Sequence, residues 1–164
     1  MEPRWLDAEE QQAWRQYLHA SRLLEAAMDR DLQAYGVQLT EYEIIAVLSE
    51  ASGQKCRMSV IAEQVVQSRS RLTHTAGRLE KRGWVSREPC AGDRRGVELM
   101  LTDEGRAAVV QMAPDHVHSV LTYLVQPLPR GDFLALGRAM AAVGEGIKAK
   151  GASDEVVNAD EQPA

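Results

Sequence analysis

The sequence contains few aromatic residues and no long hydrophobic run. Aromatic side chains make up 5% of the 164 residues, with a single Phe, so the core must come mainly from Leu, Val, Ile, Ala and Met. No run of about 18 apolar residues is present, which excludes a membrane-spanning helix. The opening residues, MEPRWLDAEEQQ, lack the basic-then-apolar pattern of a secretion signal. We therefore expect a cytoplasmic globular protein without a membrane partner.

Patterns for catalysis, disulfides and metal binding are equally scarce. Two cysteines do not make a disulfide framework, so we interpret them as free thiols; a redox switch at Cys90 or Cys56 is the alternative. His116 and His118 would point about 200° apart on a helix, and cysteine or carboxylate partners at zinc spacing are missing. No nucleophile–base pair or phosphate-binding loop is recognisable. We expect neither an enzyme nor a bound metal or cofactor.

Basic residues are concentrated in one stretch of an otherwise acidic chain. The formal net charge is -5, yet eight Lys and Arg residues stand against three Asp and Glu between Gln67 and Val97. An acidic body with one basic surface is typical of proteins that bind DNA.

Apolar spacing predicts a mainly α-helical fold with a small β-hairpin. A long amphipathic helix should open at Asp7 and end at Gly36. A second helix should open with a capping box formed by Thr40 and Glu43, and a short third helix should begin at Met58.

The following helix, Ser68–Arg82, should form a helix-turn-helix unit with the short helix before it. Leu72, Ala76 and Leu79 recur at helical spacing and should face inward. The candidate DNA-binding residues project away from this inward face. They are Ser68, Arg69, Ser70, Arg71, Thr73, His74 and Arg78. At least one of these arginines should contact DNA, and some should contact phosphate alone.

A hairpin is predicted beside this helix, with strands at Trp84–Glu88 and Gly96–Leu101. Its loop carries Asp93, Arg94 and Arg95, and two adjacent arginines suit a narrow, electronegative minor groove. The hairpin would therefore act as a DNA-binding wing.

Two more helices should follow the hairpin. Thr102 opens the first, which Pro114 must kink or split. The second should span about Arg130 to Lys148, and residues 151–164, with four acids and no base, should be a disordered tail.

The run SRSRLTHTAGRLEKRGWVSREPCAGDRRGVELMLTDEG resembles the signature of the MarR (multiple antibiotic resistance regulator) family of bacterial transcription factors. Its most diagnostic portion is Asp93-x-Arg95, followed by Leu101, Thr102 and Gly105. The coarse helix order and the chain length also agree, so the resemblance covers about residues 8–149.

The resemblance implies a winged helix-turn-helix domain at residues 37–101, flanked by dimerisation helices at 1–36 and 102–150. Such a homodimer would bind a palindromic operator in double-stranded DNA, with Arg95 in the minor groove and Asp93 helping to hold it. It would commonly be a repressor that a small phenolic or lipophilic ligand releases. The family's usual ligand pocket would involve Tyr17, Leu18, Tyr42 and Ile45.

One alternative is a winged-helix module that binds protein instead of nucleic acid, because a fold does not determine a function. A second is thiol sensing, but neither cysteine lies on the first helix, where the peroxide-sensing branch of the family carries its cysteine.

Overall fold

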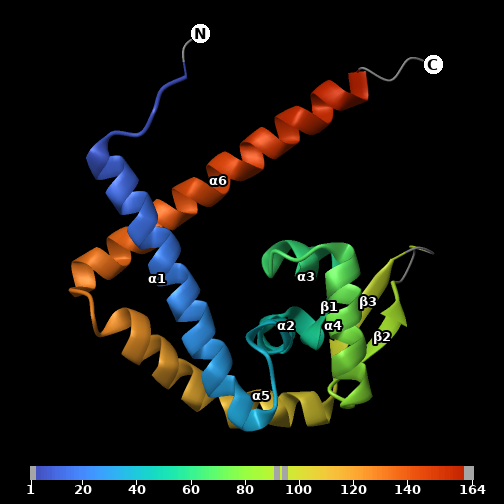
Figure 1. Ribbon diagram of the computed structural model, residues 1–164. Helices are drawn as coiled ribbons and strands as arrows, with labels where there is room; N and C mark the ends of the chain where they lie inside the picture. The colour runs from blue at the N-terminus through green and yellow to red at the C-terminus, as the bar shows by residue number, and fades with distance from the viewer. Residues whose placement is uncertain (1–2, 91–92, 94–95, 161–164) are drawn as a thin grey trace. The chain divides into compact units, whose positions relative to one another are not determined.

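The computed structural model describes residues 3–90, 93 and 96–160 (Figure 1). They fall into two compact units, Met1–Val120 and Leu121–Ala164. The main elements are α1 (Ala8–Leu32), α2 (Leu39–Glu50), β1 (Lys55–Arg57), α3 (Met58–Gln64), α4 (Arg69–Lys81), β2 (Val85–Pro89), β3 (Val97–Leu101), α5 (Asp103–Val120) and α6 (Arg130–Asp160). Short 3-10 turns follow α1 and α2, and a π-helical segment, Leu121–Val125, follows α5.

The small sheet has three antiparallel strands in the order β1-β3-β2. In the predicted hairpin Val85 pairs with Leu101 and Pro89 with Val97. The third strand, β1, was not predicted from the sequence, because three residues are too few to show the alternation of a strand. It places Cys56 opposite Leu99, so β3 is the central strand.

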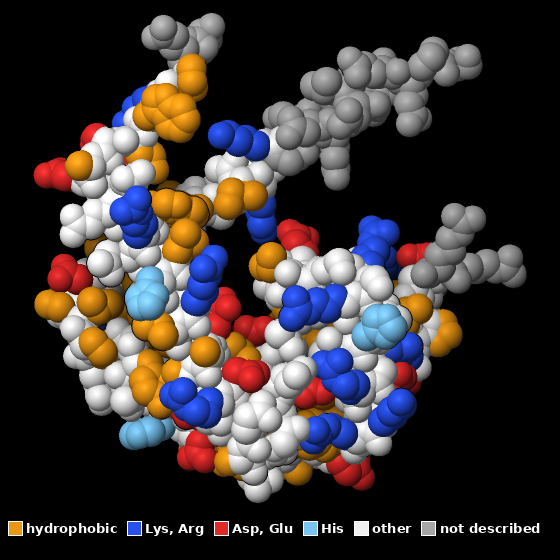
Figure 2. Space-filling model, viewed as in Figure 1, with side chains coloured by type: hydrophobic (Ala, Val, Ile, Leu, Met, Phe, Trp, Pro, Cys, Tyr) orange, Lys and Arg blue, Asp and Glu red, His pale blue; other side chains and the backbone are white. Residues whose placement is uncertain are grey.

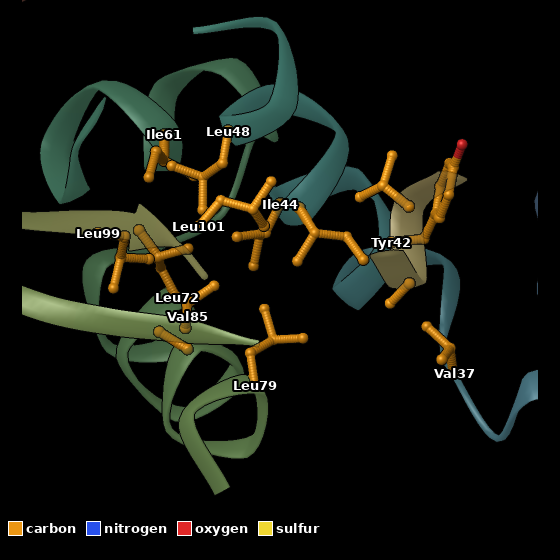
Figure 3. Close-up of a cluster of buried hydrophobic side chains, with 14 of the residues drawn as sticks. Val37, Tyr42, Ile44, Leu48, Ile61, Leu72, Leu79, Val85, Leu99 and Leu101 are labelled. Carbon is orange, nitrogen blue, oxygen red and sulfur yellow. The ribbon is translucent and has the colours of Figure 1, made fainter. Parts of the chain in front are cut away.

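Apolar side chains from α2, α3, α4 and the sheet form the core of the first unit (Figure 3). The largest side chains with less than 2% exposure include Ile44, Leu48, Ile61, Leu79 and Leu99. Burying a side chain of this size stabilises the fold by about 1.5–3 kcal/mol. This core fixes α4 against the sheet, and the wing and the fourth helix are therefore held as one body.

Helices α1 and α5 pack in the same unit as the winged helix. Ser119 donates a hydrogen bond to Asp31 over 2.6 Å, and the Tyr35 hydroxyl donates to Asp115. The division of the chain into a separate DNA-binding domain and dimerisation helices stays a prediction.

Most predicted helix boundaries agree with the structure. Asp7 and Glu10 form a capping box at the start of α1, and Gly36 adopts the left-handed conformation (φ 64°) just beyond its end. Ser68 caps α4, and Thr102 accepts a hydrogen bond from the backbone N–H of Gly105.

Two predicted helix boundaries need correction, and one of the two alternatives for Pro114 is excluded. Helix α2 begins one residue before Thr40: the backbone N–H of Gln38 donates to Glu41 over 2.9 Å, in place of the Thr40–Glu43 box. Pro114 lies inside α5, which continues to Val120, so this proline does not split the helix, and the alternative of a kink stays a prediction. Helix α6 continues to Asp160, beyond the end near Lys148 that the sequence predicted. The disordered tail expected at residues 151–164 stays a prediction.

Candidate nucleic-acid interface

Helix α4 has one buried face and one exposed face. Leu72, Ala76 and Leu79 are buried, as the helical spacing predicts, and Thr75 is buried with them. The remaining positions of the predicted interface are exposed, namely Arg69, Ser70, Arg71, Thr73, His74 and Arg78, together with the capping residue Ser68. Figure 2 shows Lys and Arg side chains gathered over the region of α4 and the sheet. The burial of one face thus leaves a basic and hydroxyl-rich face in solvent.

The start of α4 is arranged to present backbone N–H groups. The Ser68 hydroxyl accepts a hydrogen bond from the backbone N–H of Arg71 over 3.2 Å. Thr73 turns its hydroxyl back to the Arg69 carbonyl oxygen over 2.8 Å. The free amides and the positive end of the helix dipole favour an anion at this end.

A hollow of about 390 Å³ separates α4 from the start of α2. We call it the α4 hollow, and its lining comprises Gln38, Thr40, Ser68, Ser70, Arg71, His74, Thr75 and Arg78. Five of these are predicted interface residues, which the structure therefore brings together on one surface.

Arg78 has a second function besides carrying charge on this surface. Its Nε donates to Glu41 Oε1 over 2.9 Å and its Nη2 donates to Gln38 Oε1 over 3.0 Å. Glu41 is 3% exposed, so Arg78 neutralises a buried carboxylate. The ion pair fixes the Arg78 side chain and leaves only part of the guanidinium for another partner.

The loop of the wing is held by an ion pair that the sequence did not suggest. Arg57 Nη1 on β1 lies 3.3 Å from Asp93 Oδ2. A second hollow of about 330 Å³, the wing hollow, lies here and includes Arg57, Ser59, Arg69 and Thr73 in its lining. Arg57 and Ser59 thereby join the basic surface.

The wing is also tied to α4. Arg87 on β2 donates from Nη2 to the Thr73 carbonyl oxygen over 3.0 Å and pairs with Glu80 at 3.3 Å. At the tip, the Cys90 N–H donates to the Gly96 carbonyl oxygen. Arg94 and Arg95 lie outside the described residues, so their minor-groove assignment stays a prediction.

A larger cleft of about 1100 Å³ lies on another side of the same unit. We call it the α1–α2 cleft; its walls come from α1, α2, the turn between α3 and α4, Arg71 and His116. Arg71 therefore lines both the α4 hollow and this cleft.

Of the four residues predicted for a ligand pocket, Tyr42 lines the α1–α2 cleft. Figure 3 shows Tyr42 at the margin of the core, with its hydroxyl directed away from Ile44. Ile45 is wholly buried in the core, Tyr17 is 45% exposed, and Leu18 is half-buried. The structure therefore gathers one predicted residue at the cleft and places the other three elsewhere.

The two thiols are poorly placed for redox sensing. Cys90 is 6% exposed. Burial raises the pKa of the Cys56 thiol, and the nearby Glu98 charge raises it further, while a hydrogen bond from Arg57 acts in the opposite direction. A raised pKa reduces the thiolate fraction, on which reactivity depends.

Comparison with solved structures identifies the family of this chain. AbsC, a MarR family transcriptional regulator from Streptomyces coelicolor, is 39% identical, with a TM-score of 0.84 over 90% of this chain and 99% of AbsC. Sco3205, a MarR family regulator from the same organism solved in complex with DNA, is 42% identical, with a TM-score of 0.85 over 88% of this chain and 91% of Sco3205. The chain belongs to the MarR family. The MarR family model itself matches residues 35–96.

Two curated relatives align with a smaller part of the chain than these solved structures do. PecS, a transcriptional regulator from Dickeya dadantii, is 34% identical over 100 residues, which are 60% of this chain and 60% of PecS. The repressor MprA from Escherichia coli strain K12 is 31% identical over 94 residues, 57% of this chain and 53% of MprA. The match thus spans between half and two thirds of each of these relatives.

The MarR winged-helix fold predicted from the sequence is therefore confirmed. Among the described residues, no helix combines the length and apolar character needed to cross a membrane. Arg57, Arg87 and Glu41 are structural parts of the basic surface that sequence reasoning missed, because their partners lie between 7 and 37 positions away in the chain.

Proposed function

We propose that this MarR family protein is a homodimeric transcriptional regulator that binds palindromic operator DNA. Helix α4 would enter the major groove, and the wing, with Arg95, would enter the adjacent minor groove. The observation that carries the proposal is the exposed N-terminal half of α4, where Arg69, Ser70 and Arg71 stand in solvent above a buried apolar face. The complex of Sco3205 with DNA supports it.

Exposed apolar side chains support the homodimer. Met140, Val143 and Ile147 are 38%, 53% and 67% exposed and share one face of α6. Trp14 and Tyr17 on α1 stack at 6.0 Å between ring centroids and are about half exposed. Large apolar side chains exposed in a row favour association with another surface, and a second copy would cover them.

We further propose that the protein represses transcription until a small ligand occupies the α1–α2 cleft. The repressor MprA supports the direction of control. The volume of about 1100 Å³ is sufficient for a ligand of ordinary size. The ligand would release DNA only if it binds the DNA-competent and incompetent conformations with different affinity.

The DNA interface can be tested with labelled duplexes that the wild-type protein enriches from a random library. Fluorescence anisotropy should show that Arg69→Ala, Arg71→Ala and Arg95→Ala each weaken binding about tenfold, as the loss of a groove or phosphate contact does. Affinity should also fall steeply with salt, because each neutralised phosphate releases about 0.9 counterions.

Arg15→Ala is the matched control, because Arg15 is an exposed arginine on α1. It should bind like the wild type. If Arg69→Ala and Arg95→Ala also bind like the wild type, neither α4 nor the wing forms the interface. If no duplex is enriched even at low salt, DNA binding itself is refuted.

A further inference from the structure

The α1–α2 cleft has an apolar interior. Leu24 and Met28 come from α1, Leu39, Tyr42 and Val47 from α2, and Val65 from the end of α3. These side chains can bury the hydrocarbon or aromatic part of a ligand, and the removal of apolar surface from water favours binding.

The charged groups of the cleft are predominantly acidic. Four carboxylates line it, from Glu25, Asp29, Glu43 and Glu50, against the two guanidinium groups of Arg22 and Arg71. Asp29 is already engaged, because its Oδ1 accepts the backbone N–H of Leu39 over 2.8 Å. The other three carboxylates remain as the acidic part of the lining.

Glu43 is the carboxylate with the least favourable surroundings. It is half-buried, and burial raises the pKa of its carboxyl, which the charge of Glu25 raises further. Within the described part of the chain, no cation lies within ion-pair distance of either Glu25 or Glu43. Two neighbouring carboxylates without a cation favour the entry of a positive charge.

Three buried polar atoms that belong to residues of the cleft have no hydrogen-bond partner among the described residues: Nε2 and Oε1 of Gln67 and Nδ1 of His116. The Gln67 amide nitrogen is a donor, and the other two atoms can accept a hydrogen bond. Burial lowers the pKa of His116, so its ring is neutral near pH 7 and one nitrogen can accept. An ammonium group carries three donors and no acceptor, which complements carboxylate, amide and imidazole acceptors.

We propose that the α1–α2 cleft binds a cationic amphipathic molecule, with a protonated amine at Glu25 and Glu43 and an apolar body against the walls. This inference rests on the proposed function, in which the same cleft receives the effector. It differs from the phenolic class that the sequence resemblance implies, because an anion would have to approach the acidic part of the lining.

The experiment uses three naphthalene probes that differ only in one substituent. They are 1-naphthylmethylamine, which is cationic at pH 7.5, 1-naphthalenemethanol, which is neutral, and 1-naphthoate, which is anionic. Isothermal titration calorimetry with the full chain should show the amine binding about tenfold more tightly than either of the others.

Variants then locate the charge preference. Glu43→Gln and Glu25→Gln should each reduce amine affinity by about 3–10-fold and leave the affinity for the alcohol within about twofold. Glu104→Gln is the control, because Glu104 is an exposed carboxylate on α5 outside the cleft. Glu43→Gln should fold normally by circular dichroism, because it removes a half-buried, repelled charge.

Three results would each overturn the proposal: naphthoate binding as tightly as the amine, amine affinity unchanged in Glu43→Gln, or no amine binding at millimolar concentration. Anisotropy with enriched DNA separates this inference from the proposed function. Loss of DNA binding with an intact amine preference would refute the regulator alone. DNA binding without an amine preference would refute the cationic ligand alone.

Discussion

At the scale of single residues, Glu41 and Arg78 connect the folding of the winged helix to its basic surface. The Glu41 carboxylate is 3% exposed and accepts hydrogen bonds from Arg78 Nε and from the backbone N–H of Gln38. A buried carboxylate needs such partners, because an unpaired charge in the interior costs several kcal/mol. Arg78 is therefore a structural residue as well as part of the predicted interface.

We predict that Arg78→Ala lowers the free energy of unfolding by about 1–3 kcal/mol, because it leaves the Glu41 carboxylate without its cation. Urea denaturation at a fixed protein concentration measures the change. Adding Glu41→Gln should recover part of the loss, because a neutral amide is less costly to bury than a charge. Arg69→Ala, on the exposed face, serves as the control. A loss no larger than that of Arg69→Ala would show that the ion pair contributes nothing to stability.

His116 should make the stability of the protein depend on pH. Burial lowers its pKa below the ordinary value, so the folded state keeps a neutral ring while the unfolded chain takes up a proton as the pH falls below about 6.5. The free energy of unfolding should therefore decrease as the pH is lowered through this range. Glu43 acts in the opposite direction, because its raised pKa favours proton binding by the folded state.

The measurement is urea denaturation between pH 7 and pH 5, with His116→Gln compared with the wild type. The variant should lose less stability on acidification, because it lacks the histidine that takes up a proton more readily in the unfolded chain than in the folded state. His118→Gln, at an exposed position two residues away, should follow the wild type. If the free energy of unfolding changes with pH equally in the wild type and in His116→Gln, the burial of His116 does not cause the pH dependence.

At the scale of elements, Gly105 sets how closely α5 approaches the chain at the end of α4. A Cβ atom built at Gly105 would lie 2.1 Å from the Trp84 carbonyl oxygen and 2.8 Å from Leu101 Cδ1. The first of these atoms belongs to the backbone and cannot move aside without shifting the β2 strand. The glycine in the family signature therefore has a steric reason.

Two helical glycines give a direct comparison. Gly105→Ala should lower the free energy of unfolding by about 1–3 kcal/mol or more through overpacking. Gly77→Ala on α4, where the nearest side-chain atom is 3.9 Å away, should raise it by about 0.5–1 kcal/mol. The midpoints of urea denaturation measure both changes. Equal stability of the two variants would show that α5 can shift away from Trp84.

Elements with a strong periodic signal could be predicted from the sequence. The spacing of Leu72, Ala76 and Leu79 identified the buried face of α4, and Val97, Leu99 and Leu101 identified β3. The three-residue strand β1 gave no such signal. The start of α2 was misplaced because both Gln38–Glu41 and Thr40–Glu43 place a polar residue three positions before a glutamate.

Sites assembled from distant segments were harder to predict. The Arg57–Asp93 pair joins positions 36 residues apart, and the sequence alone does not indicate that β1 pairs with the wing strand. The α1–α2 cleft combines side chains from α1 to α5, so its acidic character emerges only when the helices are packed. Arg69 and Arg71, in contrast, were identified because exposed basic residues on an amphipathic helix are visible in the sequence.

At the scale of the whole molecule, the proposed homodimer sets the distance between two copies of α4. Two recognition helices reach successive major grooves when their centres lie about 34–36 Å apart. A protomer with α4 intact but without its partner would lose the second half-site. Changes in dimer stability should therefore appear as changes in DNA affinity.

We predict that the double variant Val143→Glu and Ile147→Glu shifts the protein from a dimer of two 18.1 kDa chains toward the monomer. Two carboxylates would have to be buried at the interface, which costs several kcal/mol. Analytical ultracentrifugation measures the mass, and anisotropy should show weaker DNA binding. Arg138→Glu, on the opposite face of α6, is the charge-matched control. A variant that stays dimeric would place the interface elsewhere.

Arg71 lines both the α4 hollow and the α1–α2 cleft. In the proposed ligand-controlled regulator, substitutions at this position would over evolutionary time alter the preferred operator and the preferred ligand together. A lineage that acquires a new regulon through position 71 would therefore also need compensating changes in the cleft. Related proteins should accordingly show residue 71 varying in concert with cleft positions such as Glu25 and Glu43.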